Sequence, residues 1–459
     1  MARVRPLVST LVLAIGCGGT ATEPAGTTPT KPQPTATAAP PVAATDPWGT
    51  KTEAPTKPAS DNTNTDRKRA EAALARLAAV QTKLAALREL PFDRQVPAGF
   101  QETKEFREAL HREIAKELPA DKAANTSAAA FHLGFLEKPV NLAEAMEEMA
   151  AREIAAYYDP SENRFFYVRI PDSESVADMV SAHELTHALQ DQHFDLEKYI
   201  SNDLESDALI ARSFVGEGDA TFTMFGYLAK LPTLAATDLP KVEQFIRAMN
   251  ASIDLDDLSG SPPALALPTL LSYSKGAVLA QAAFKHGGWN AVNNLYKTPP
   301  DSSEQALHPE TKLYPKRDRP HRVTLAKLPG VQIDHDVIGE LMWWVYFRLW
   351  HRDAAELASE GWGGDRYLVV RQPDGNHVGV IATSWDSVED AKQFADAYTK
   401  TLVKRFPSPD NDSNTMVGVP RSDHGRVFVK LVKNRVFIVD GASDPTLINQ
   451  LVKTTKFTQ

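Results

Sequence analysis

The chain has 459 residues, a formal net charge of −9 and 42% hydrophobic residues. This length suits about two or three domains with a substantial core. The acidic balance, without a clustered basic stripe, argues against a general nucleic-acid-binding protein.

The N-terminus predicts a lipoprotein. The basic segment MARVR is followed by the short apolar run PLVSTLVLAIG and then by Cys17, the only cysteine of the chain. This order resembles a bacterial lipoprotein signal, although Ala14 stands where that signal usually has leucine. The alternative is an ordinary secretory signal with an unrelated cysteine. We predict a signal peptide at 1–17 and a lipidated Cys17 that anchors the chain to a membrane in the bacterial cell envelope.

Residues 18–64 are dominated by threonine, alanine and proline. Such a segment buries too little apolar surface to offset its ordering entropy, and proline keeps it extended. We therefore predict a disordered tether.

The next part of the chain has the periodicity of helices. A leucine stripe predicts a helix from near Thr65 to before Pro91, and further helices are expected at 102–117 and 141–156. The aromatic run 164–170 predicts a strand. A helix follows that contains SAHELTHALQDQHF at 181–194, with Ser175 and Asp178 as a capping box. Helices are also expected at 203–230 and 264–297, separated by a looser segment.

The last part of the chain has strand-like runs in addition to helical segments. A tryptophan-rich helix at 337–351 precedes four strand-like runs, RYLVVR, HVGVIATSW, RVFVKLV and RVFIVDG. A helix at 387–405 is expected between the second and third runs. This pattern is typical of an α+β domain, in which Trp343 and Trp344 pack in the core.

The stretch SAHELTHALQDQHF has the spacing of a zinc site. His183 and His187 are four residues apart, so a helix places both rings on one face, and imidazole is a preferred zinc ligand. Glu184 directly follows His183 and suits a general base.

A catalytic zinc ion needs a third protein ligand. Glu217 shares a helical stripe with apolar residues, and a buried carboxylate requires a metal or a partner such as Arg212. His193 lies at the register of the third histidine in the metzincin pattern HExxHxxGxxH, but Gln190 stands at its glycine. We favour Glu217, and we expect Asp219 to orient a ligand histidine.

HELTH with a downstream glutamate resembles the gluzincin metallopeptidases, the class of thermolysin and aminopeptidase N. Over about residues 85–380, the blocks HELTHALQDQ and EGDA are similar to those of uncharacterised bacterial metallopeptidase-like lipoproteins. The resemblance implies a peptidase that hydrolyses peptide bonds with zinc-activated water and Glu184 as general base. It also implies that the strand 164–170 is an edge strand that pairs with a peptide or protein substrate.

Two residues compete for oxyanion stabilisation. Tyr273 in YSKG resembles the tyrosine of a tyrosine–acid–lysine–glycine motif in aminopeptidase N relatives, with Ser274 in place of the acid. His308 resembles the histidine that thermolysin uses. The Gly-x-Met-Glu-Asn motif of the aminopeptidases is not found, which favours an endopeptidase.

The expected fold class is therefore α+β. A mainly helical zincin-like catalytic domain with a small edge-strand sheet spans 65–334, and an α+β domain spans 335–459. The alternative is a catalytically inactive envelope lipoprotein that acts as a binding or scaffold module.

Overall fold

The computed structural model describes residues 63–171, 173–201, 204–406, 419–421 and 424–458. The predicted signal peptide, Cys17 and nearly all of the predicted tether lie outside these residues. The last two tether residues, 63 and 64, belong to the first described helix. Among the described helices, none has the length and apolar character needed to cross a membrane.

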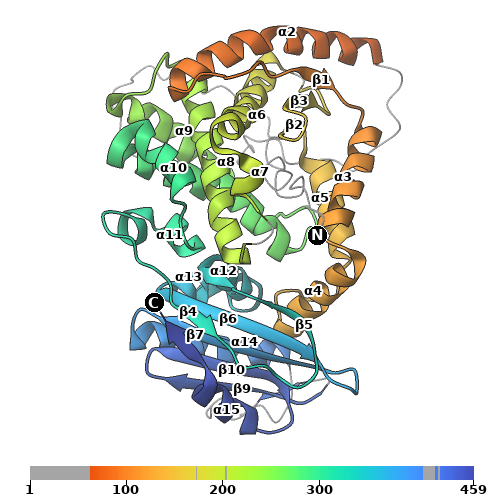
Figure 1. The fold of residues 1–459 in the computed structure, drawn as a ribbon, viewed down its shortest axis with the longest axis vertical. Helices are drawn as coiled ribbons and strands as arrows, with labels where there is room; N and C mark the ends of the chain where they lie inside the picture. Colours follow the sequence, from red (N-terminus) through yellow and green to blue (C-terminus); the bar gives the residue numbers. More distant parts are fainter. Residues whose placement is uncertain (1–62, 172, 202–203, 407–418, 422–423, 459) are drawn as a thin grey trace, which may run out of the picture.

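The N-terminal part is built from helices around a small sheet (Figure 1). Its elements are α2 (Thr63–Arg88), β1 (Ala98–Phe100), α3 (Thr103–Glu117), α4 (Ala120–Leu133), α5 (Leu142–Glu153), β2 (Ala156–Asp159) and β3 (Arg164–Tyr167). The strand order is β1-β3-β2, with β1 parallel and β2 antiparallel to β3. The predicted strand at 164–170 is thus the central strand, and β2 lies at the edge.

Three long helices pack together, because α8 (Ser206–Leu228) contacts both α6 (Glu174–Phe194) and α10 (Pro263–Lys297). The helices α7 (Leu196–Tyr199), η1 (Ala236–Asp238) and α9 (Leu239–Ser252) lie between them in the chain. The N-cap of α6 is Ser173, whose side chain accepts a hydrogen bond from the backbone N–H of Val176. The predicted capping box at Ser175 is therefore wrong by two residues. α10 breaks at Gly287 and Gly288, where the backbone leaves the helical region.

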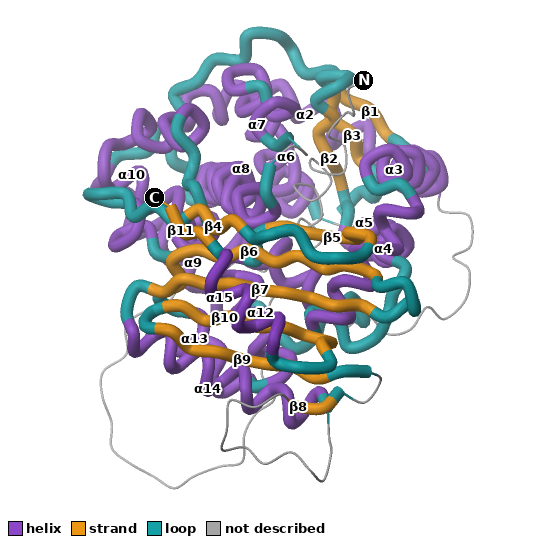
Figure 2. The backbone as a smooth tube through the Cα atoms, turned by 60° about the horizontal axis from the view of Figure 1, so that its bottom comes forward, coloured by secondary structure: helices purple, strands orange, loops and turns teal. Residues whose placement is uncertain are grey.

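The C-terminal part contains a six-stranded antiparallel sheet of order β5-β6-β7-β10-β9-β8 (Figure 2). Its strands are β5 (Val331–Asp336), β6 (Trp362–Arg371), β7 (His377–Trp385), β8 (Val419–Pro420), β9 (Arg426–Val432) and β10 (Arg435–Ala442). Helices lie against this sheet: α12 (Gly339–Trp350), α13 (Ala355–Ser359) and α14 (Val388–Arg405), with η3 (Arg352–Ala354). α12 contacts β6 and α10, α14 contacts β7, β9 and β10, and α13 contacts both of these helices. Two short helices, α11 (Ser303–Leu307) and η2 (Pro309–Leu313), lie in the chain between α10 and the strands of the C-terminal part. β4 (Arg322–Thr324) pairs with β11 (Lys456–Thr458), which follows α15 (Thr446–Thr454).

The structure confirms the α+β class and most of the predicted elements. The four strand-like runs are β6, β7, β9 and β10, and Trp343 and Trp344 are buried. Three helices of nine or more residues were missed: the alanine-rich α4, α9, whose Leu239, Val242 and Ile246 form a buried stripe, and α15. The short helices α7, α11 and α13 were missed as well. The predicted helix at 141–156 ends at Glu153, because residues 156–159 form β2. The sheet also begins with β5 at 331, before the expected boundary at 335.

The hydrophobic core is continuous between the two parts. One cluster of buried side chains extends from Leu77 and Leu84 of α2, through α6, α8 and α10, to Trp343 of α12 and Phe394 of α14. The three long helices therefore sit in a packed interior, which gives side chains on them fixed positions.

Candidate metal centre

α6 holds two histidine rings in the interior of the protein. His183 and His187 lie one turn apart on its buried face, and both are at most 1% exposed. Their ring centroids are 4.7 Å apart, with the ring planes nearly perpendicular at 82°. The Nε2 atoms of the two rings are 3.1 Å apart, so both point to the same small volume.

α8 packs against α6 and brings Glu217 to the same volume. Its Oε2 atom lies 3.1 Å from Nε2 of His183 and 3.7 Å from Nε2 of His187. These three residues form the one group of possible metal ligands found among the described residues. The predicted proximity of Glu217 is thus confirmed. The alternative ligand, His193, is bound elsewhere, because its Nε2 lies 2.7 Å from the backbone oxygen of Pro91.

The spacing of the three donor atoms suits a tetrahedral metal ion. Ligands at ~2.0–2.1 Å from zinc in a tetrahedral arrangement are about 3.3–3.4 Å from one another. The observed separations are 3.1, 3.1 and 3.7 Å. In addition, Oε1 of Glu217 and Nδ1 of His183 are buried without a hydrogen-bond partner among the described residues. A cluster of this kind is costly unless a cation or another ligand satisfies it.

Burial disfavours charge on all members of the cluster. It lowers the pKa of His187 to about 4 and also lowers that of His183, so both imidazoles are neutral at pH 7. Burial raises the pKa of Glu217 to about 7. Neutral imidazole is the form that binds metals, and a bound divalent cation would lower the pKa of the neighbouring carboxyl group.

Glu184 lies between the cluster and the edge strand β2. Its Oε2 accepts a hydrogen bond of 3.2 Å from the backbone N–H of Tyr158, and its Oε1 has no partner among the described residues. Burial, followed by the nearby charge of Glu217, raises the pKa of Glu184 well above its usual range. Glu184 therefore combines one anchored oxygen with one oxygen that is available for proton transfer.

A close crossing of α8 and α10 brings Tyr273 to the cluster. A Cβ atom on Gly218 would lie 2.1 Å from the backbone oxygen of Gly276, so only glycine permits this approach. Gly218 directly follows Glu217, and Gly276 lies three residues after Tyr273. An interaction with the Tyr273 side chain is among the influences that lower the pKa of Glu217 against the effect of burial. The ring centroid of Tyr273 is 5.5 Å from that of His183.

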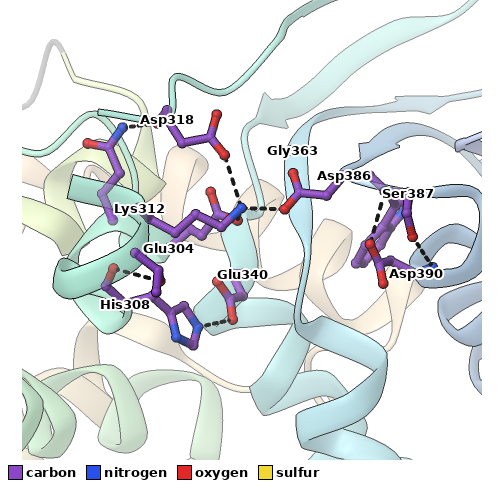
Figure 3. A network of polar contacts seen from close by, with 12 residues as sticks. Glu304, His308, Lys312, Asp318, Glu340, Gly363, Asp386, Ser387 and Asp390 are labelled. Atoms are coloured by element: carbon purple, nitrogen blue, oxygen red, sulfur yellow. Dashed lines mark hydrogen bonds and ion pairs between the residues drawn. The ribbon is translucent and has the colours of Figure 1, made fainter. Parts of the chain in front are cut away.

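His308 belongs to a different group of polar residues (Figure 3). Its Nε2 lies 2.8 Å from Oε1 of Glu340 on α12, and this hydrogen bond raises the pKa of His308. Beside it, the Lys312 ammonium group is surrounded by carboxylates of Glu304, Asp318 and Asp386. No contact described for His308 involves the His183–Glu217 cluster. Of the two candidates, Tyr273 is the one that reaches the cluster.

Asp219, which was expected to orient a ligand histidine, reaches His187 through another side chain. The side chain next to Nδ1 of His187 is Gln190, at 2.8 Å, and Asp219 contacts Gln190. Asp219 also forms a buried salt bridge with Arg88, the last residue of α2. Sequence reasoning missed Arg88. The sequence did contain a sign that Arg88 is buried, because it is a charged residue four positions after Leu84 on the apolar face of the predicted helix.

A family match was found for the C-terminal part of the chain only. Residues 325–450 match a family described as a domain of unknown function, DUF8575. This match contains the six-stranded sheet and its helices but none of the residues of the His183–Glu217 cluster. No curated protein and no solved structure matches the chain.

Proposed function

We propose that the protein is a zinc-dependent peptidase and that His183, His187 and Glu217 hold the zinc ion. The observation that carries the proposal is the mutual spacing of three buried donor atoms, which suits tetrahedral zinc. Two neutral imidazoles and one carboxylate leave a fourth position open, as catalytic zinc sites do. Glu184 adds a proton-transfer group that a purely structural zinc site does not need.

The residues around the cluster have distinct roles in this proposal. A zinc ion bound there would polarise a carbonyl group and lower the pKa of water. Glu184 accepts a proton at its free Oε1 and delivers it to the leaving amine. Tyr273, whose side chain interacts with Glu217, stabilises the negative charge that develops on the carbonyl oxygen.

The position of β2 supports a peptide substrate. The N–H groups of a strand alternate between its partner strand and its opposite side. Since the N–H of Tyr158 donates to Glu184 and not to β3, the outer edge of β2 borders the cluster. An extended peptide adding to this edge would pass Glu184 and Tyr273. Cleavage within chains, as an endopeptidase, fits such binding.

The proposed location is the bacterial cell envelope. It is supported by the N-terminal sequence, in which Cys17 follows a short apolar run and precedes the Thr/Ala/Pro-rich segment. A lipidated Cys17 would hold the catalytic part near a membrane surface.

The test is a comparison of wild type with Glu184→Gln. We expect about one zinc ion per chain in both proteins, and a fall in peptide cleavage of about 10²–10⁴-fold in the variant. Metal analysis and digestion of a peptide library measure the two quantities. The matched control is Glu174→Gln on the same helix, because the Glu174 side chain is 84% exposed. Zinc binding without Glu184-dependent cleavage would favour the alternative of an inactive envelope lipoprotein.

A further inference from the structure

We propose that Gln190 is a positioning residue that fixes the proton of His187 on Nδ1, and that Asp219 and Arg88 hold Gln190 in place. The inference rests on the proposed zinc site and concerns the residues that contact a ligand histidine on the side away from the proposed metal position. Gln190 lies on α6 one turn after His187 and is 1% exposed.

The contacts of Gln190 fix the orientation of its side-chain amide. Its Nε2 lies 3.0 Å from the backbone oxygen of Gly216 and 3.3 Å from Oδ2 of Asp219. Both of these atoms can only accept hydrogen bonds, so the amide nitrogen must face them. The amide oxygen is then the atom that lies 2.8 Å from Nδ1 of His187.

This orientation decides the tautomer of His187. An amide oxygen accepts and cannot donate, so Nδ1 of His187 must carry the proton. The neutral ring then has its lone pair on Nε2, the atom that faces His183 and Glu217. Gln190 thus directs the lone pair of His187 toward the proposed metal position. Because Gly216 and Asp219 belong to α8, Gln190 also ties together the two helices that carry the ligands.

Asp219 is held by side chains of two further helices, α2 and α10, and by a neighbour on α8 itself. Arg88 of α2 donates to both of its oxygens, from Nε at 2.8 Å and from Nη2 at 3.1 Å. Tyr296 of α10 donates to Oδ2 at 2.9 Å, and Thr223 of α8 is 3.4 Å from Oδ1. A bidentate arginine fixes the plane of a carboxylate, so Oδ2 is held in place for Gln190.

Arg88, the last residue of α2, connects this helix to the residues around His187. Its guanidinium is fully buried, donates to Asn293 at 2.7 Å and lies 4.2 Å from the ring centroid of Trp289. A buried charge with these fixed contacts has little freedom to move. The chain Arg88–Asp219–Gln190–His187 therefore connects α2 to a ligand ring through hydrogen bonds between buried side chains.

The first test measures zinc affinity in the full chain by competition with a chelator. Gln190→Met keeps the length of the side chain but removes its hydrogen bonds to His187, Gly216 and Asp219, and we expect zinc affinity to fall about 10–100-fold. Arg88→Lys retains the charge but loses the bidentate contact, and we expect a smaller fall. The control is Gln192→Met on the same helix, whose Nε2 contacts the backbone oxygen of exposed Arg94 and the side chain of half-buried Asn163. Thermal unfolding of the metal-free proteins shows whether each variant is folded.

The second test needs no substitution. In zinc-loaded wild type labelled with ¹⁵N-histidine, we expect the His187 ring to carry its proton on Nδ1 and to exchange that proton slowly. A proton on Nε2 of His187, or unchanged zinc affinity in folded Gln190→Met, would overturn this inference but would leave the proposed zinc site unaffected. Wild type that binds no zinc would instead overturn the proposed function. Loss of affinity in Gln192→Met equal to that in Gln190→Met would also contradict a specific role for Gln190.

Discussion

Two of the buried acidic centres among the described residues differ in how well their polar atoms are satisfied. In the C-terminal part, Asp365 accepts hydrogen bonds from the backbone N–H groups of Ile338 and Gly339 and from the indole nitrogens of Trp343 and Trp362, at 2.7–3.2 Å. The His183–Glu217 cluster has equal burial, but buried atoms of His183 and Glu217 lack partners among the described residues.

The difference separates a structural centre from a candidate functional one. Asp365 joins the start of α12 to β6, and its four donors compensate for the lost hydration of the carboxylate. Burial still raises its pKa to about 6. The His183–Glu217 cluster leaves buried polar atoms without hydrogen-bond partners among the described residues, which costs stability unless a ligand occupies the site.

The largest effect is expected for Asp365→Ala. The substitution leaves four buried donors without an acceptor, and we expect the free energy of unfolding to fall by about 3–5 kcal/mol. Chemical denaturation measures this change, and added zinc should not reverse it. Asp374→Ala in an exposed turn is the matched control and should have a much smaller effect. A loss for Asp365→Ala no larger than for the control would break the contrast.

The second prediction concerns the response to zinc. At a zinc concentration about a thousand times Kd, binding to the folded state stabilises wild type by about 4 kcal/mol. Glu217→Gln removes one of three ligands, so most of this stabilisation should disappear at the same zinc concentration. Thermal unfolding with and without zinc measures both values. Equal stabilisation of the two proteins would mean that zinc binds at another place.

The smallest effect is a pH dependence of the metal-free protein. The pKa of Glu217 is about 7 in the folded state against 4.5 for the free carboxyl group, because burial disfavours its charge. Between these values the folded state binds the proton that the unfolded state releases, so the Glu217 contribution to stability decreases as pH rises from about 4.5 to about 7.

Glu217→Gln removes this contribution. Over the same pH range, the free energy of unfolding of metal-free Glu217→Gln should therefore increase relative to wild type, by at most about 3 kcal/mol. Denaturation at several pH values measures the difference. A constant difference from pH 4.5 to 7 would show that Glu217 is not held in a desolvated environment.

Local patterns in the sequence predicted much of the fold. The leucine stripe of α2 and the alternating runs of β6, β7, β9 and β10 reflect the periods of the helix and the strand, which neighbouring residues determine. α4 was missed because its alanine-rich sequence has little apolar contrast between faces. The strand predicted at 164–170 begins as expected but ends at Tyr167. Its central position in β1-β3-β2 was not predicted, since order in a sheet depends on residues distant in the chain.

The sequence by itself determined which side chains of α6 share a face, because four residues are close to one helical turn. The pairing of His183 with His187 follows from that spacing, and Glu184 is adjacent to His183 in the sequence. Only the tertiary structure decided what surrounds them. Arg88 and Asp219 are 131 positions apart, and their meeting depends on how four helices pack against one another. Gln190 had been identified only as a departure from a glycine pattern. Its contacts with α8 indicate a role in holding His187, because helix packing places an amide between an imidazole and a carboxylate.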